Sequence, residues 1–301
     1  MELDLSKIRE YGRLDFLAKQ LVEGFITGLH KSPFHGFSVE FAEHRLYNAG
    51  ESTRHIDWKV FSKTDKLFVK TYEEETNLRC YLLVDVSSSM YYPQKSRGKL
   101  AFSVLAAAAL ANMLQRQRDA VGLVTFSDHI ETQTECRSTT THLQKVFREL
   151  EQVLNREKRN QSTAVTDTLH LVADKIHTRS LVVIFSDMFE DMENSERLFS
   201  ALQHLKHNKH EVLLFHVADK KTELDFDFAD GPYEFIDLET NERLKLQPAQ
   251  VKDQYVKTLN NFYHELKIKC GQYKIDFIEV DIEKGFDPIM SSFLAKRAKM
   301  H

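Results

Sequence analysis

From residue 78 onward, nearly continuous apolar runs alternate with stretches of helical periodicity. Apolar residues recur three and four positions apart over 143–154, the spacing of an amphipathic helix. Strands without polar alternation are typical of a sheet covered on both faces, so the pattern predicts a doubly wound, mostly parallel α/β sheet. The runs that predict its strands are Cys80–Val84, Val121–Phe126, Leu181–Phe185 and Val212–Val217.

The first 77 residues have a different pattern of apolar and polar positions. Their pattern predicts one helix over about 14–29 and strands near 37–41 and 66–72. We interpret residues 1–77 as an N-terminal extension packed on the α/β domain of residues 78–301, because seventy-odd residues with so few apolar side chains make a poor independent core.

A second departure follows residue 218. Two short strands, at 233–237 and 243–246, flank a polar turn, and a long amphipathic helix comes after them. The pattern therefore predicts a hairpin and helix that leave the sheet at about 220–269. The chain then returns with a last strand near 273–280 and a closing helix over 288–299.

Composition excludes several classes of protein. The chain has 41 basic and 45 acidic side chains, a formal net charge of -4, so it lacks the positive field of a nucleic-acid binder. Its three cysteines include no C-x-x-C pair, which indicates reduced thiols. The N-terminus lacks the apolar core of a signal peptide, and Ala101–Leu114 is too short to span a bilayer. We expect a cytoplasmic protein with no transmembrane segment.

Oxygen-bearing side chains stand where predicted strands end. Asp85, Ser87 and Ser89 follow the first core strand, Asp187 follows another, and Thr163 lies in a loop between them. Because parallel strands end at one edge of the sheet, these side chains are expected to converge, and hydroxyl and carboxylate oxygens suit a hard cation such as Mg²⁺. The alternative is that each merely caps the helix after it.

This D-x-S-x-S, threonine and aspartate order resembles the metal-ion-dependent adhesion site of the von Willebrand factor A fold. The resemblance implies a Rossmann-type topology. It also implies that Mg²⁺ or Mn²⁺ is bound by the five residues Asp85, Ser87, Ser89, Thr163 and Asp187. Thr166 is an alternative to Thr163.

An upstream segment carries a second resemblance. G-E-S-T-R-H-I-D-W at Gly50–Trp58, followed by K-L-F-V-K at Lys66–Lys70, is similar to the signature of the bacterial domain of unknown function 58 family. We interpret Arg54, Asp57 and Trp58 as structural, an ion pair beside a large apolar anchor. The resemblance implies an adaptor that works with a MoxR-type AAA+ ATPase in the assembly or activation of other proteins.

The leading hypothesis is a non-enzymatic interaction module whose bound ion accepts an Asp or Glu from a protein partner. One alternative is a Mg²⁺-dependent phosphoester hydrolase with Asp85 as nucleophile, although Ser87 stands where such enzymes usually have a second carboxylate. Another is a scaffold without an ion. The sequence has no P-loop, G-x-S-x-G or H-E-x-x-H motif. We interpret His204, His207 and His210 as partners of a helix C-terminus.

Overall fold

The computed structural model describes residues 14–31, 44–46, 61–62, 67–70, 78–93, 98–156, 165–188, 195–238 and 242–298. Its contacts divide the chain into two units. One comprises Met1–Ile26 with Leu78–His301, and the other comprises Thr27–Asn77.

The first unit is built on a six-stranded sheet with the strand order β10-β7-β6-β3-β4-β5. Neighbouring strands are parallel, except that the edge strand β5 runs antiparallel to β4. The predicted mostly parallel α/β sheet is therefore confirmed. In chain order its strands are β3 (Arg79–Asp85), β4 (Ala120–Phe126), β5 (Ile130–Gln133), β6 (Leu181–Ser186), β7 (Glu211–Ala218) and β10 (Asp276–Asp281).

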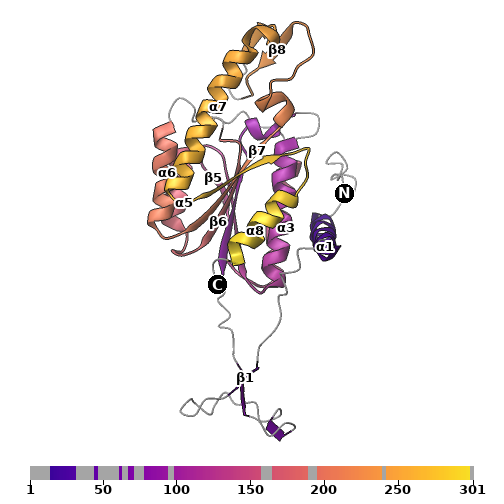
Figure 1. Ribbon diagram of the computed structural model, residues 1–301, viewed down its shortest axis with the longest axis vertical. Coiled ribbons are helices and arrows are strands. Elements are labelled where there is room, and N and C mark those ends of the chain that lie inside the picture. The colour runs from indigo at the N-terminus through magenta and orange to yellow at the C-terminus, as the bar shows by residue number, and fades with distance from the viewer. Residues whose placement is uncertain are drawn as a thin grey trace. The chain divides into compact units, whose positions relative to one another are not determined.

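Helices cover both faces of this sheet, which explains why its strands lack polar alternation (Figure 1). Side chains of one strand enter two different cores: Leu82 and Val84 pack on one face, Tyr81 and Leu83 on the other. The first face is covered by α3 (Gly98–Arg116), α4 (Thr140–Asn155) and α8 (Asp287–Ala298). The helix α1 (Leu14–Lys31) adds apolar side chains to the same core from outside this layer, where it contacts Glu151 of α4 and Arg116 of α3. The second face is covered by α5 (Val165–Lys175), α6 (Ser195–His207) and α7 (Pro248–Gln272).

The central helix α3 is buried along almost its whole length. Every residue from Gly98 to Leu114 is buried, Lys99 included. By length and composition, α3 is the one helix among the described residues that could cross a membrane, but 94% of its apolar stretch is buried inside the protein. A core helix packed between a sheet and other helices has this composition.

Close packing between neighbouring strands makes Gly122 sensitive to substitution. A Cβ at Gly122 would lie 2.8 Å from two ring atoms of Tyr81, its partner across the β3–β4 ladder. We expect Gly122→Ala to lower the free energy of unfolding by about 1–3 kcal/mol, as overpacking of a full core does. Urea denaturation measures this. The matched control is Gly271→Ala in α7, where a Cβ meets nothing within 4 Å; equal losses in both variants would contradict the explanation.

The chain leaves the sheet after β7 through the π-helical turn η5 (Lys220–Leu224) and an antiparallel hairpin of β8 (Tyr233–Ile236) and β9 (Arg243–Leu246). Stacking of the Phe226 ring on Phe235, and its contact with Tyr255 of α7, join the three segments. The hairpin and the first half of α7 extend beyond the sheet (Figure 1), whereas Leu259 and Leu266, further along α7, are buried against it. The later part of α7 is thus a covering helix of the domain.

The second unit contains an antiparallel pair, β1 (His44–Leu46) and β2 (Phe68–Lys70). β2 lies within the strand predicted at 66–72. The strand predicted at 37–41 lies outside the described residues, and the packing of the whole extension on the domain stays a prediction.

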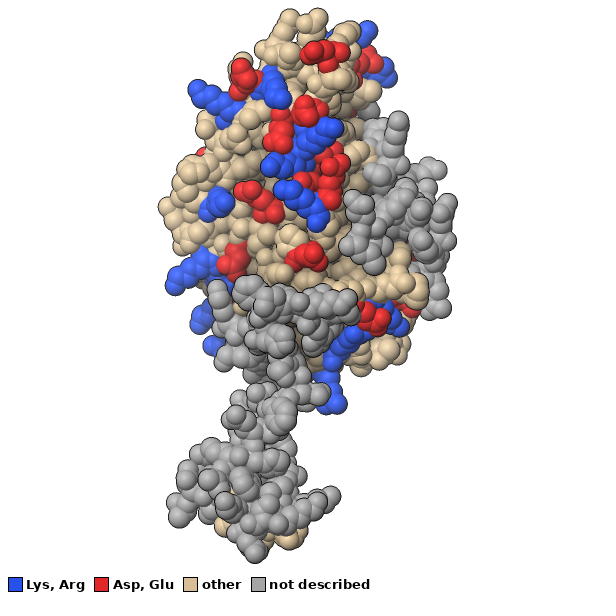
Figure 2. Space-filling view, turned by 45° about the vertical axis from the view of Figure 1, so that its right-hand side comes forward, with Lys and Arg blue, Asp and Glu red and all other residues tan. Residues whose placement is uncertain are grey.

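Figure 2 shows how charged side chains are distributed on one face of the described chain. Lys and Arg are interspersed there with Asp and Glu, so neither sign dominates that face.

Candidate metal centre

The loop after β3 turns two serine hydroxyls toward each other. Asp85 ends the strand, and its Oδ1 accepts a hydrogen bond of 2.9 Å from the Ser87 backbone N–H. This contact curls the loop into the short 3₁₀ turn η3 (Ser89–Tyr91), and the Met90 N–H donates to the Ser87 carbonyl. The hydroxyl oxygens of Ser87 and Ser89 then lie 3.1 Å apart.

Asp187 reaches the same place from the neighbouring strand. It follows β6, which pairs directly with β3. The Ser186 hydroxyl donates a 2.6 Å hydrogen bond to Asp85 Oδ2 and accepts one of 3.0 Å from the Met188 N–H, so it ties the two strand ends together. A hydrogen bond also joins the side chains of Ser89 and Asp187. The structure thus brings together Asp85, Ser87, Ser89 and Asp187.

The position of this cluster of side chains in the sheet follows from the order of the strands. The chain passes from β3 to β4 on one side and later adds β6 on the other, so strand order reverses at β3. Ligands of open α/β sheets bind at the carboxyl ends of strands beside such a switch point. Asp85 is the last residue of β3 and Asp187 directly follows β6, and these two strands flank the switch point.

A buried lysine that the sequence reasoning missed completes the cluster. Lys99, in the first turn of α3, has no exposed side-chain surface, and its Nζ lies 2.7 Å from Asp187 Oδ2. The same Nζ forms an ion pair with the Glu223 carboxylate of η5. One signal was available: Lys99 stands at the start of the long apolar stretch that forms the core helix, and a buried ammonium requires acidic partners. Which acids pair with it could not be read from the pattern.

The two aspartates have opposite electrostatic environments. Burial, and then the nearby charge of Asp187, raises the pKa of Asp85 to about 7, although hydrogen bonds from Ser186 and Ser87 oppose the rise. Burial also acts to raise the pKa of Asp187, but the charge and hydrogen bond of Lys99 outweigh it and hold that pKa below its usual range. Asp187 is therefore the firmly ionised member, whereas none of the main influences on Asp85 among the described residues is a cation.

His216, on β7, contacts the backbone of Asp187. Its Nε2 is 3.0 Å from the Asp187 carbonyl oxygen, and its ring packs against Tyr263. Burial lowers the pKa of His216 to about 4, so the ring is neutral at physiological pH and its Nε2–H donates to that carbonyl. Sequence reasoning gave no signal for this role, because a histidine inside a buried strand looks like any other core residue.

The remaining predicted site residues have different outcomes. Thr163 lies outside the described residues, as do Arg54, Asp57 and Trp58 of the upstream signature. The alternative Thr166 is buried in the first turn of α5. The assignments of Thr163 and of the signature residues stay predictions.

The three histidines near the end of α6 do not gather around one point. His204 Nδ1 lies 2.9 Å from His170 Nδ1 of α5, whereas buried His210 accepts a hydrogen bond from the Ser180 N–H. Among the residues that the structure describes, no group of three or more His, Cys, Asp or Glu side chains is placed to hold a metal ion. The predicted site differs from such a group because it relies on hydroxyls as much as on carboxylates.

The donor set at the sheet edge suits a small divalent cation. Two facing hydroxyls and two carboxylates are hard oxygen ligands of the kind Mg²⁺ and Mn²⁺ prefer. The raised pKa of Asp85 is what a buried carboxylate shows when the nearby positive charge is insufficient for two. The residues present therefore fit the ion that the sequence resemblance implies.

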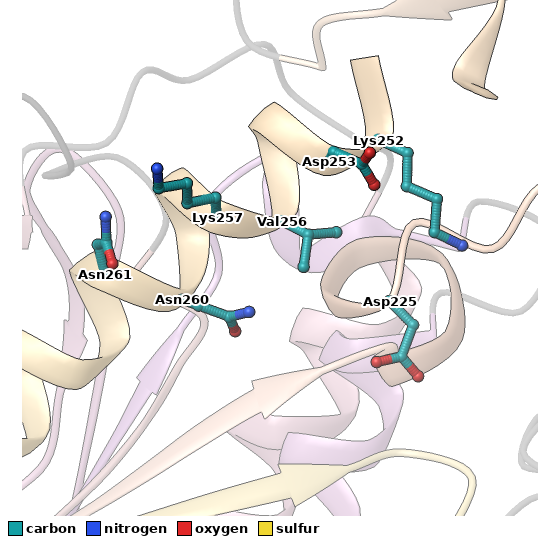
Figure 3. Close-up of a pocket in the computed structure, with 7 residues that line it drawn as sticks. All are labelled: Asp225, Lys252, Asp253, Val256, Lys257, Asn260 and Asn261. Atoms are coloured by element: carbon teal, nitrogen blue, oxygen red, sulfur yellow. The ribbon is translucent and has the colours of Figure 1, made fainter. Parts of the chain in front are cut away.

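A separate groove of about 480 Å³ lies between α7 and the segment after η5. Val256 and Asn260 project from α7 toward the segment that carries Asp225 (Figure 3). Its lining combines acidic, basic and amide side chains, and none of the predicted metal-site residues contributes to it.

Comparison with known protein families identifies the chain. Residues 43–263 match the family described as "Protein of unknown function DUF58", which is most of the chain. The protein belongs to the DUF58 family. The predicted family membership is confirmed by this match.

Two relatives of this DUF58 protein with curated sequences are mycobacterial proteins described as uncharacterized. Rv1480 of Mycobacterium tuberculosis and Mb1516 of Mycobacterium bovis are each 25% identical over 212 residues, 69% of this chain. The chain spans 64% of the length of these relatives.

Solved structures similar to this DUF58 chain include two from Bacteroides. BatB of Bacteroides thetaiotaomicron (TM-score 0.44) and an aerotolerance-related membrane protein of Bacteroides fragilis (TM-score 0.47) are each 16% identical, covering 74% of this chain and 99% of theirs. A third is the SpRpn10 VWA domain, with a TM-score of 0.38 and 10% identity over 71% of this chain and 94% of that domain.

Proposed function

We propose that this DUF58 protein is a non-enzymatic protein-interaction module that depends on Mg²⁺ or Mn²⁺. The observation that carries the proposal is the meeting of Asp85, Ser87, Ser89 and Asp187 at one buried edge of the sheet. A bound ion would supply concentrated positive charge at this edge. We assign the loop of Thr163 to the same site, as the sequence resemblance implies.

The chemistry of these side chains favours an acidic partner. Hydroxyls are neutral ligands, and the charge of Asp187 is offset in part by Lys99, which Asp187 shares with Glu223. A divalent ion held mainly by such groups retains positive charge and an open coordination position. We therefore propose that the partner offers an Asp or Glu side chain.

A metal-free scaffold is the second candidate, and one contact favours it. Lys99 already gives Asp187 a cation from within the chain, at 2.7 Å. Because this ion pair already stabilises the Asp187 carboxylate, a bound divalent ion would add less to its stability. Ion titration separates the two candidates.

Titration calorimetry with Mg²⁺ and Mn²⁺ tests the proposal. The chain is expected to bind one ion, and the double variant Ser87→Ala/Ser89→Ala to lose most of that affinity because it lacks both facing hydroxyls. The control is Ser200→Ala on the exposed side of α6. Ion at about 100 times its dissociation constant should also stabilise the native protein by about 2.7 kcal/mol. Absence of binding by the unaltered chain would favour the scaffold.

The partner and cellular location are further proposals that rest on family resemblance. We propose a cytoplasmic adaptor that works with a MoxR-type AAA+ ATPase in the assembly or activation of other proteins. Affinity capture with purified ATPase, in Mg²⁺ and in EDTA, tests this pairing. The sheet edge where Asp85, Ser87, Ser89 and Asp187 meet is called the metal edge. Capture that persists equally in EDTA and with Asp85→Asn protein would show that the metal edge is not the binding surface.

A further inference from the structure

The turn η5 is tied to the metal edge by an ion bridge that the sequence resemblance does not include. Lys99 Nζ contacts Asp187 Oδ2 at 2.7 Å and also the carboxylate of Glu223. Lys99 has no exposed side-chain surface, and only 14% of the Glu223 side chain is exposed. A candidate metal ligand and the turn that leads to the hairpin therefore share one buried ammonium.

Hydrogen bonds fix Glu223 in this position. Its second carboxylate oxygen accepts a 2.8 Å bond from the Asp219 N–H at the start of the turn. Thr222 donates to Asp219 Oδ2 and accepts a 2.8 Å bond from the hydroxyl of Tyr92, which directly follows η3. The turn is thus bound both to the first turn of α3 and to the loop that carries the two serines.

The turn also leads to the hairpin. Two residues after η5, the ring of Phe226 stacks on Phe235 of β8 and lies 4.5 Å, centroid to centroid, from Tyr255 of α7. Contacts therefore run from Asp187 through Lys99 and Glu223 to the segments that extend beyond the sheet. They start at the buried side chains of Asp187 and Lys99, follow the backbone of the turn to buried Phe226, and end at the half-buried rings of Phe235 and Tyr255. Such a contiguous series of contacts is what a physical coupling between two places uses.

We propose that the ion pair between Lys99 and Glu223 (the latch) becomes stronger when an ion binds at the metal edge. Ion binding at that edge would then stabilise the conformation of η5 and the hairpin. This inference rests on the proposed function. Without an ion, Asp187 and Glu223 share the ammonium of Lys99. An ion beside Asp187 repels Lys99 and competes for the Asp187 carboxylate, and because the ammonium stays buried it turns to Glu223 as its main counter-ion.

The variant Glu223→Gln tests the latch with little change of shape. Its amide oxygen still accepts the Asp219 N–H, but its charge is gone, so of the two carboxylates that contact Lys99 only Asp187 remains charged. Affinity for Mg²⁺ by calorimetry should fall roughly 10- to 100-fold, as for other residues that act through a metal ligand. Glu265→Gln on the exposed side of α7 is the matched control and should leave the affinity unchanged.

Hydrogen exchange of the 219–228 segment gives a second readout. Amides of Glu223, Asp225 and Asp227 donate within this turn. Mg²⁺ should slow their exchange in the unaltered chain roughly tenfold, and Glu223→Gln should abolish that protection. Glu223→Asp keeps the charge and shortens the reach, so it should retain most ion affinity and lose the protection; it also serves if the glutamine variant does not fold.

The outcomes separate the latch from the proposed function. If the unaltered chain binds Mg²⁺ and Glu223→Gln matches it in affinity and exchange, the latch is wrong and the metal site stands. If the unaltered chain takes up no ion, the proposed function fails and the ion-linked latch fails with it. A faster exchange of 219–228 in ion-free Glu223→Gln would then leave Glu223 as a purely structural tie.

Discussion

Replacement of Lys99 by methionine is expected to lower the free energy of unfolding by about 3–5 kcal/mol, the range seen when one partner of a buried ion pair is removed. Methionine fills similar volume but leaves Asp187 and Glu223 without their shared cation. Burial acts to lower the pKa of Lys99, yet Asp187 and Glu223 raise it above its usual range, so this lysine is charged at neutral pH. Urea denaturation at neutral pH in EDTA measures the loss.

An exposed ion pair supplies the control for this prediction. Lys267 and Glu279 lie 3.6 Å apart, with more than half of each side chain exposed. Lys267→Met should therefore cost about 0–1 kcal/mol, as surface pairs do. A loss of similar size in both variants would mean that Lys99 is replaceable by any apolar side chain, and the buried bridge would have no special importance.

The architecture of the domain was predictable because each strand is recognisable on its own. Leu181–Phe185 has no polar residue to mark a solvent side, and the structure shows why: Val183 and Phe185 enter one core, Val182 and Ile184 the other. Local composition therefore contains the information that the sheet is covered twice. The place of Asp85 and Asp187 follows from the same reasoning, since parallel strands present their carboxyl ends at one edge.

The interactions that complete the site depend on long-range contacts. Lys99 meets Asp187 across 88 residues of sequence and Glu223 across 124. Glu223 lies in a π-helical turn, which periodicity does not predict, because it fits neither the helical nor the strand repeat. The serine at 186 is adjacent to a predicted ligand, but its bond to Asp85 exists only because β6 pairs with β3.

The segment predicted to leave the sheet at about 220–269 does so only in part, because the later turns of α7 pack on the sheet. The pattern of α7 is amphipathic along its later turns, and those turns place Leu259, Phe262 and Leu266 against the sheet. Its earlier turns contact the hairpin through Tyr255. The helix α7 thus packs on the hairpin with its earlier turns and on the sheet with its later turns. Periodicity alone does not reveal at which residue the contact changes.

Asp85→Asn is expected to stabilise the ion-free protein above pH 7 while it removes ion binding. The pKa of Asp85 is raised to about 7, first by burial and then by Asp187, whereas an unfolded aspartate titrates near 3.9. Between these values the native state holds more protons than the unfolded state, so this group makes stability fall as pH rises. Above pH 7 the full penalty, on the order of 4 kcal/mol for about three pKa units, is present.

Asparagine removes this penalty because it has no proton to lose. Its amide can accept from the Ser87 N–H and donate to the Ser186 hydroxyl, the two groups that now contact Asp85. Urea denaturation in EDTA at pH 5 and at pH 8 should therefore show a stability gain for Asp85→Asn that is larger at pH 8. Calorimetry with Mg²⁺ on the same variant should show no ion binding.

Asp187→Asn is the matched comparison, and its effect on the free energy of unfolding is expected to have the opposite sign. Lys99 lowers the pKa of Asp187 against the effect of burial, so its carboxylate stabilises the native state above the unfolded pKa, and that stability is lost as pH falls through the folded value. The same chemical change should therefore destabilise the protein at pH 8, since Lys99 loses an ionised partner. Equal destabilisation by both variants at pH 8 would contradict the raised pKa of Asp85. Opposite signs would indicate that Asp85 is held in an unfavourable environment, which a bound divalent ion would relieve.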